Sequence, residues 1–197
     1  MEFQEKLPLR KQIAYACGML GWSIMINVIT VMLIYFYLPP VKSGLVNLVP
    51  QFTILGVFNA MALIASSGRF VDAITDPLIA FYSDNSKNPK GRRIPFMKFG
   101  VLPSFIFCVL IFVPLSNAES VGNVAWLTLT LMAFFFSLTI YIIPYNALLP
   151  ELGHNATEKL RLSTWLSMAF VIGIIISSQT PILADLIEDQ FSLQSRM

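Results

Sequence analysis

Five long apolar stretches dominate the sequence and limit the folds that this chain can adopt. They cover residues 12–38, 51–82, 96–115, 123–149 and 163–184. A helix needs about 20 mostly apolar residues to cross the roughly 30 Å hydrocarbon core of a bilayer. Each stretch reaches that length, so the pattern predicts an all-α membrane protein with about five transmembrane helices.

The composition agrees with a membrane environment. Hydrophobic residues make up 56% of the chain and charged residues 12%, with a mean hydropathy of +0.70, whereas about a quarter of the residues in a soluble domain are charged. The first stretch is longer than the apolar core of a signal peptide, about 7 to 15 residues, and no small-residue cleavage site follows it before Pro39. We expect it to remain as a helix, and residues 1–197 to form one membrane domain.

The cations are distributed unevenly between the predicted loops. Short loops rich in Lys and Arg stay in the cytoplasm. Alternation of the five helices puts most cations on one side, so we expect a cytoplasmic amino terminus and a multi-pass protein of the cell (inner) membrane. On that side are Lys6, Arg10, Lys11, Lys87, Lys90, Arg92, Arg93, Lys98, Lys159 and Arg161, whereas the other side has only Lys42 and Arg196.

Several function classes are disfavoured by the sequence. The net charge is only +2, and no aromatic platform is interleaved with the basic cluster, so no nucleic-acid partner is expected. His154 is the only histidine and lies in a predicted loop, which argues against a histidine-based metal site or a catalytic triad. Cys17 and Cys108 fall in predicted helices, where a thiol behaves as a small hydrophobe. We expect no enzyme activity, no cofactor and no metal other than Na⁺.

Three charged residues interrupt the second apolar stretch. Asp72 and Asp76 are four residues apart and share a helix face, and Arg69 precedes Asp72 by three on nearly the same face. With the cytoplasmic helix end near Ser83, a rise of 1.5 Å per residue places Asp76 roughly 10 Å and Asp72 roughly 16 Å into the bilayer. An ion at a helix centre costs about 2.5 to 3.5 kcal/mol, so these side chains are expected to face protein or water.

The charges on this face do not cancel. Arg69 can neutralise one carboxylate, which leaves one acid free to bind a cation or a proton. Pro77 cannot donate a hydrogen bond to the carbonyl of Ala73, so a further backbone oxygen lies nearby. Clustered oxygen ligands suit Na⁺, Li⁺ or H⁺, and they predict a cation site at Asp72 and Asp76. The alternative is an Arg–Asp pair that only locks this helix into the bundle.

Two sequence blocks carry a family resemblance. The first joins residues 72–77 (DAITDP), 83–84 (SD) and 91–96 (GRRIPF), and the second joins 141–152 (YIIPYNALLPEL) and 158–162 (EKLRL). The blocks resemble the glycoside-pentoside-hexuronide:cation symporter family, the melibiose-carrier branch of the major facilitator superfamily. Together with part of the first helix, the resemblance spans most of the chain.

The resemblance implies roles for the charged residues. Asp72 and Asp76 match the two carboxylates of helix two that bind the coupling cation, and Arg69 matches the arginine of the same helix. A loop on the cytoplasmic side matches the segment that helps to hold the two halves of a carrier in the outward-facing state, although a plain basic loop is the alternative. The residues of this gating loop are Asp84, Gly91, Arg92 and Arg93.

The sugar-binding groups of the melibiose carrier are not retained. The corresponding positions hold Ser23, Ile142, Asn146 and Leu166 or Ser167, so an α-galactoside is not the expected solute. Milder polar and aromatic side chains remain near the expected cavity, and ordinary packing is the alternative role for them. These substrate-cavity candidates are Trp22, Ser23, Asn27, Tyr141, Tyr145 and Asn146.

The resemblance predicts cation-coupled symport of a small solute such as a sugar or a glycoside, with Na⁺ or H⁺ as the coupling ion. A lysolipid or amphiphile carrier of the same family is one alternative, and a non-transporting membrane interaction fragment is another. Carriers of the superfamily have two halves of six helices, so the chain is expected to be an amino-terminal part that lacks the sixth helix and the carboxy-terminal half. Its expected partners are the solute, the lipid bilayer and that missing half.

Overall fold

The computed structural model describes residues 7–39, 46–51, 53–54, 58–89, 91–184 and 186. Within these residues the chain forms five long helices, a further helical segment at 180–184 and 186, and one pair of two-residue strands, so the predicted all-α fold is confirmed. Lys6, Lys42, Lys90 and Arg196, which support the topology prediction, lie outside the described residues. The elements are α1 (Leu9–Tyr37), β1 (Thr53–Ile54), β2 (Phe58–Asn59), α2 (Ala60–Asp84), α3 (Ile94–Ile111), α4 (Val121–Leu152) and α5 (Ala156–Ser178), and β1 pairs antiparallel with β2.

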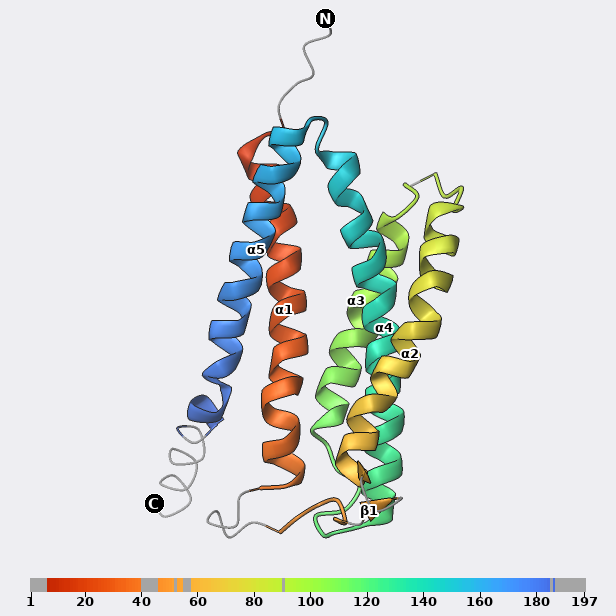
Figure 1. The fold of residues 1–197 in the computed structure, drawn as a ribbon, viewed down its shortest axis with the longest axis vertical. Coiled ribbons are helices and arrows are strands. Elements are labelled where there is room, and N and C mark those ends of the chain that lie inside the picture. Colours follow the sequence, from red (N-terminus) through yellow and green to blue (C-terminus); the bar gives the residue numbers. More distant parts are fainter. Residues whose placement is uncertain are drawn as a thin grey trace, which may run out of the picture.

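Four of the described helices, α1, α3, α4 and α5, are long and apolar enough to cross a membrane. The chain is therefore a multi-pass membrane protein. Helix α2 has 25 residues, about 37 Å at 1.5 Å per residue, but it contains four charged residues, Arg69, Asp72 and Asp76 within its length and Asp84 at its end. It lies beside α4 along the bundle (Figure 1).

The two largest differences from the predicted helix boundaries are at helix starts, where local capping decides the first residue. The stretch predicted to be helical from residue 51 becomes helical only at Ala60, where the Asn59 side chain accepts a hydrogen bond from the Ala62 N–H at 2.7 Å. Helix α5 begins at Ala156, before the predicted residue 163, because the Asn155 side chain accepts a bond from the Glu158 N–H at 2.8 Å. Apolar composition alone does not show where such caps fall.

The helices form two groups (Figure 1). Helices α1 and α5 lie side by side, and α2, α3 and α4 make the second group. Small residues allow close approach within each group. A Cβ added to Gly173 would lie 2.5 Å from the Ser23 hydroxyl oxygen, and a Cβ added to Gly100 would lie 2.7 Å from the backbone nitrogen of Tyr141.

One end of the bundle gathers three segments that are far apart in the sequence. The start of α1, the α2–α3 connection and the α4–α5 connection all lie at the end drawn uppermost in Figure 1. These are the segments that the topology prediction assigns to a single side of the membrane. The arrangement agrees with the alternation of helices on which that prediction depends.

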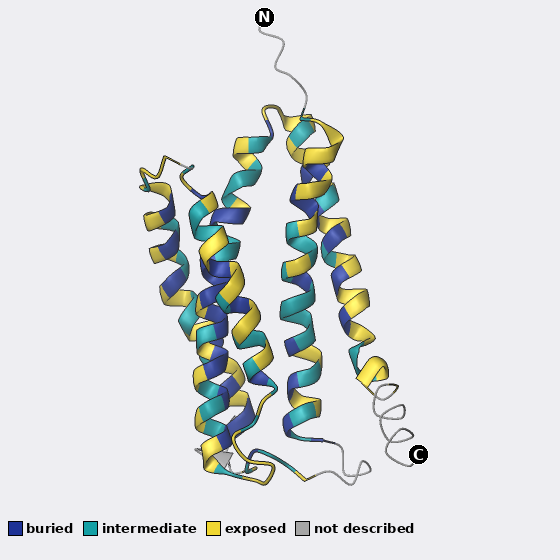
Figure 2. Ribbon diagram, turned by 180° about the vertical axis from the view of Figure 1, so that it is seen from behind, coloured by how far each residue is buried: buried dark blue, intermediate teal, exposed yellow. Residues whose placement is uncertain are grey.

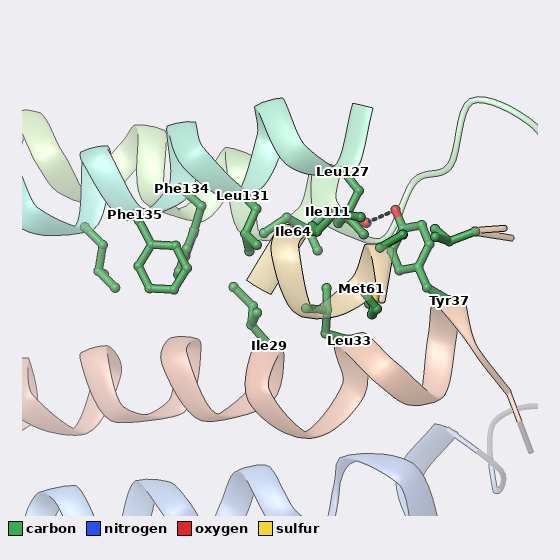
Figure 3. Packing of buried hydrophobic residues seen from close by; sticks show 13 residues of the cluster. Ile29, Leu33, Tyr37, Met61, Ile64, Ile111, Leu127, Leu131, Phe134 and Phe135 are labelled. Atoms are coloured by element: carbon green, nitrogen blue, oxygen red, sulfur yellow. Dashed lines mark hydrogen bonds between the residues drawn. The ribbon is translucent and has the colours of Figure 1, made fainter. Parts of the chain in front are cut away.

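The main hydrophobic core lies at the opposite end, where α1 meets the second group. Figure 3 shows Ile29 and Leu33 of α1 facing Met61 of α2 and Leu131 of α4. Tyr37 is fully buried there, and its hydroxyl donates to the backbone oxygen of Ile111 at 2.5 Å, the dashed line in Figure 3.

The outer surface is apolar. Exposed residues occur along every helix in Figure 2, and many of them are large hydrophobic side chains. Phe99, Leu102 and Phe105 of α3, for example, are all more than half exposed. Lipid tails are as apolar as these side chains, so the surface suits the interior of a bilayer.

Candidate functional site

The centre of the site is a threonine of α4 that lies between two aspartates of α2. Thr139 is 2% exposed, and its hydroxyl oxygen is 3.2 Å from an oxygen of Asp72 and 3.2 Å from an oxygen of Asp76. The spacing of four residues on α2 aligns the two carboxylates on one face. The packing of α2 against α4 then brings both to the same hydroxyl group.

One hydroxyl group cannot satisfy two carboxylates at once. It has a single hydrogen, and each carboxylate is an acceptor only when ionised. The two distances are equal and longer than the usual 2.7 to 2.8 Å of an O–H···O bond. A cation between the carboxylates, or a proton on one of them, would remove this mismatch, and the hydroxyl oxygen would then be a third oxygen ligand.

The charge partner of the pair is held loosely. Arg69 Nη1 lies 3.7 Å from Asp72 Oδ2, and the Arg69 side chain is 76% exposed whereas that of Asp72 is 23% exposed. The guanidinium carbon lies 5.8 Å from the centre of the Phe135 ring, within the range of a cation–π contact. An ion pair of this length and exposure is weak.

A cavity of about 420 Å³ opens beside these charges, between α1, α2, α4 and α5. It is lined by six residues that the sequence predicts for the site: Trp22, Asn27, Arg69, Asp72, Asp76 and Asn146. The cavity thus combines the predicted cation site with part of the predicted solute site.

Three predicted cavity residues lie elsewhere. Ser23 is fully buried against α5, where its hydroxyl donates to the backbone oxygen of Phe170 at 2.7 Å. Tyr145 is 1% exposed and stacks on Tyr15. Tyr141 lines a separate cavity of about 240 Å³ and stacks on Tyr145. The helix faces explain the difference, because residues next to each other in a helix point about 100° apart.

The sequence interpretation missed Thr139, although the spacing contained a signal for it. Thr139 precedes Ile142 by three residues and Asn146 by seven, so the three share a face of α4, and all of them line the cavity. Thr30 of α1 and Phe170 of α5 also line it. Threonine and phenylalanine are too common in apolar helices for the sequence to single out these two residues.

A second polar cluster joins the ends of α2 and α4. Arg93 Nη2 lies 2.9 Å from Asp84 Oδ1 and 3.0 Å from Glu151 Oε1, and the Arg93 side chain is only 10% exposed. Arg92 also pairs with Glu151. Gly91 has a φ of +104°, a conformation that L side chains rarely adopt. Three of the four predicted gating-loop residues, Asp84, Arg92 and Arg93, therefore join one cluster of ion pairs, with Glu151 as a partner that the sequence interpretation did not include.

Among the described residues, no group of three or more His, Cys, Asp or Glu side chains could hold a metal ion. The oxygen donors at the α2–α4 contact are two carboxylates and one hydroxyl. This donor set suits a monovalent cation or a proton rather than a tightly held divalent metal, which takes six or more oxygen ligands.

Comparisons with known proteins extend over nearly the whole chain. The family model described as MFS/sugar transport protein matches residues 14–196. An uncharacterized symporter of Synechocystis sp. is 30% identical over 175 residues, which cover 86% of this chain and 29% of the relative. An Escherichia coli protein with the provisional name of sulfoquinovose importer is 28% identical over 178 residues, 87% of this chain and 34% of the relative.

A third relative, an Escherichia coli protein with the provisional name of glycoside/cation symporter, is 26% identical over 161 residues, 81% of this chain and 32% of the relative. The chain therefore spans about a third of the length of these curated relatives. The family model covers far more than half of the chain, and the membrane-spanning helices agree with it. The chain belongs to the MFS/sugar transport protein family.

Proposed function

We propose that this chain takes part in cation-coupled symport of a small polar solute, with Asp72 and Asp76 as ligands of Na⁺ or as the carrier of H⁺. The observation that carries the proposal is the placement of both carboxylates at 3.2 Å from one hydroxyl, that of Thr139. Charged residues within membrane helices are costly and mark ion pathways. Membership of a transport family supports the same interpretation.

Coupling requires that the ion and the solute affect each other's binding, and this effect is reciprocal. Support for such coupling comes from the shared cavity, in which the carboxylates of α2 and the polar side chains of Trp22, Asn27 and Asn146 line one space of about 420 Å³. A cation bound to Asp72 and Asp76 would neutralise negative charge next to the solute.

The solute that we propose is a sugar, a glycoside or a related polar compound. Relatives named as a sulfoquinovose importer and a glycoside/cation symporter support this class. An amphiphile is the second candidate, because a cavity of about 460 Å³, lined mainly by apolar residues such as Leu33 and Leu131, adjoins Arg69.

We further propose that α2 crosses the membrane with the other four helices, that the amino terminus is cytoplasmic and that the membrane is the inner one. Support comes from the gathering of the predicted cytoplasmic segments at one end of the bundle (Figure 1). The cluster of Asp84, Arg92, Arg93 and Glu151 is then a cytoplasmic latch between α2 and α4. The solute would be enclosed between these helices and further ones, encoded with the chain or supplied by another polypeptide.

The proposal is tested by ion binding and by uptake in vesicles, with the protein expressed as its natural gene encodes it. Na⁺ or Li⁺ should raise the melting temperature relative to choline, and a sodium or proton gradient should drive uptake of labelled glycosides. Asp76→Asn should abolish both effects. Glu119→Gln is the matched control, because Glu119 is exposed in the α3–α4 connection. Gradient-driven uptake that survives Asp76→Asn would overturn the assignment.

A further inference from the structure

We propose that Phe135 of α4 is a positioning residue for the cation site: its ring holds the Arg69 guanidinium away from the two carboxylates of α2, so that their negative charge stays available for Na⁺. This inference rests on the proposed function and deepens it, because it names a residue that sets the affinity of the site without touching the ion. Phe135 carries neither a charge nor a hydrogen-bonding group, so it acts through Arg69.

Two facing rows of side chains set the arrangement. On α2, Arg69 precedes the carboxylates of Asp72 and Asp76 by one to two turns. On α4, Phe135 precedes Thr139 by four residues, so the two share a face. The Thr139 hydroxyl meets both carboxylates at 3.2 Å, and the Phe135 ring meets the guanidinium, whose carbon lies 5.8 Å from the ring centre. The cation and the anions of α2 therefore have different partners on α4.

The ring and Asp72 attract the same guanidinium. The ion pair has an N···O distance of 3.7 Å, with Arg69 76% exposed, whereas a strong Arg–carboxylate pair has about 2.7 to 2.9 Å. An arginine that precedes its acid is also the less favourable order in a helix. At such exposure an ion pair and a cation–π contact are of comparable strength. The ring therefore keeps the guanidinium farther from Asp72 than an unopposed ion pair would.

A glycine makes room for the ring. Gly68, next to Arg69 in α2, is buried, and a Cβ at this position would overlap the Phe135 ring. The ring therefore lies directly on the backbone of α2, and Phe135 is only 8% exposed. On its other side it packs edge-on against Phe134, with 5.5 Å between ring centres (Figure 3). These contacts fix the ring, and the exposed Arg69 side chain adapts to it.

The affinity of the site depends on where the guanidinium lies. Asp72 and Asp76 carry two negative charges and Arg69 one positive charge. A guanidinium at hydrogen-bonding distance from Asp72 would occupy oxygens that a cation needs, and it would repel the cation at close range. A guanidinium drawn toward the ring leaves those oxygens open to Na⁺. Loss of the attraction to the ring should therefore weaken Na⁺ binding.

The test weakens the attraction of the ring while it nearly keeps the shape. Phenylalanine analogues with an increasing number of ring fluorines are incorporated at position 135 of the protein, expressed as its natural gene encodes it. Fluorine withdraws electron density from the ring face, to which a cation is attracted. The Na⁺ concentration at the midpoint of the rise in melting temperature should increase with fluorine content, by about twofold to fivefold in total, which corresponds to about 0.5 to 1 kcal/mol. An unchanged midpoint across the series would overturn the proposal.

Substitutions assign the effect to the contact between the ring and Arg69. Phe135→Leu should raise the Na⁺ midpoint to a similar extent, but it should change nothing in an Arg69→Gln protein, which has no guanidinium to release. Phe134→Leu is the matched control, because Phe134 is a fully buried neighbour: its loss should lower the melting temperature and leave the midpoint unchanged. A shift that persists in Arg69→Gln, or that Phe134→Leu reproduces, would reveal a packing effect and refute the positioning role.

Gly68→Ala reaches the same contact from α2, because its Cβ displaces the Phe135 ring. It should raise the Na⁺ midpoint in the wild-type background and have no further effect in Phe135→Leu. Gly21→Ala is the control, since nothing lies within 4 Å of the added Cβ. A folded Gly68→Ala protein with the wild-type midpoint would contradict the proposal.

The failure of this inference and the failure of the proposed function give different results. If Na⁺ does not stabilise the wild-type protein, or stabilises Asp76→Asn equally, the proposed Na⁺ site is wrong and the role of Phe135 falls with it. If Na⁺ stabilises the wild-type protein but not Asp76→Asn, while the fluorinated series keeps one midpoint, the cation site stands and only the role of Phe135 falls.

Discussion

Tyr15 of α1 and Tyr145 of α4 each donate a hydrogen bond to the backbone oxygen of the other, at 2.9 and 2.5 Å, while their rings stack with 4.5 Å between centres. The two residues are 130 positions apart in the sequence. This reciprocal pair joins the α1–α5 group to the α2–α3–α4 group at the end where the chain begins. It also explains why Tyr145 is not available to the cavity.

Tyr145→Phe should destabilise the protein by about 1 to 2 kcal/mol, because the ring stack remains while the buried carbonyl of Tyr15 loses its donor. Tyr82→Phe is the control, since Tyr82 is 59% exposed. Thermal unfolding in detergent measures the difference. Equal melting temperatures for the two variants would show that the reciprocal bonds do not contribute to stability.

Thr139→Val should lower the affinity for Na⁺ about tenfold, because it removes the hydroxyl that both carboxylates share while it keeps the side-chain volume. Thr139→Ser retains the hydroxyl and should stay close to the wild type. Thr164→Val provides the control, since Thr164 is exposed and its hydroxyl donates to the backbone oxygen of Leu160 in the same helix. The measurement is a titration of the melting temperature with Na⁺, and an unchanged midpoint for Thr139→Val would contradict a role in the cation site.

Arg93→Gln should cost more stability than Arg92→Gln. The Arg93 side chain is 10% exposed and pairs with Asp84 and Glu151, whereas that of Arg92 is 47% exposed and, among the described residues, pairs with Glu151 alone. We expect about 1.5 to 3 kcal/mol for Arg93 and less than about 1 kcal/mol for Arg92. Chemical denaturation of both variants measures the two stability losses. If these cations served only to set the membrane orientation, the two losses would be equal.

Gly100→Ala should destabilise the contact between α3 and α4 by about 1 to 3 kcal/mol. Its Cβ would lie 2.7 Å from the backbone nitrogen of Tyr141 and 2.9 Å from the backbone oxygen of Ser137, and backbone atoms cannot move aside as a side chain can. Gly21→Ala is the matched control, because nothing lies within 4 Å of the added Cβ. There the change should be neutral or slightly stabilising. Similar melting temperatures for both variants would argue against close packing at Gly100.

The sequence predicted best those features that depend on the geometry of one helix alone. The spacing of Asp72 and Asp76 puts both on one face of α2 whatever the packing, and the structure has both at one hydroxyl. Thr139 could not be chosen in advance, because its role depends on the register between α2 and α4. The same dependence on packing explains why Ser23, predicted for the cavity, instead bonds to α5.

Charge partners across loops were equally hard to foresee. Arg92 and Arg93 are conspicuous in the sequence, but Glu151 lies 58 residues beyond Arg93 and could pair with several cations at the same end of the bundle. The start of α2 depends on one side-chain bond of Asn59. Apolar residues on both sides of Asn59 hide that boundary from a hydropathy pattern.

Tyr37 gives α1 a second fixed point, through its bond to the backbone oxygen of Ile111 at 2.5 Å. The bonds of Tyr15 and Tyr37 lie roughly 33 Å apart along the helix at 1.5 Å per residue, about the thickness of the hydrocarbon core. Helix α1 is therefore anchored near both of its ends, and Trp22 and Asn27, which line the cavity, lie between the anchors. We therefore expect a force on this middle part to bend the helix between the two bonds rather than to tilt it as a rigid rod.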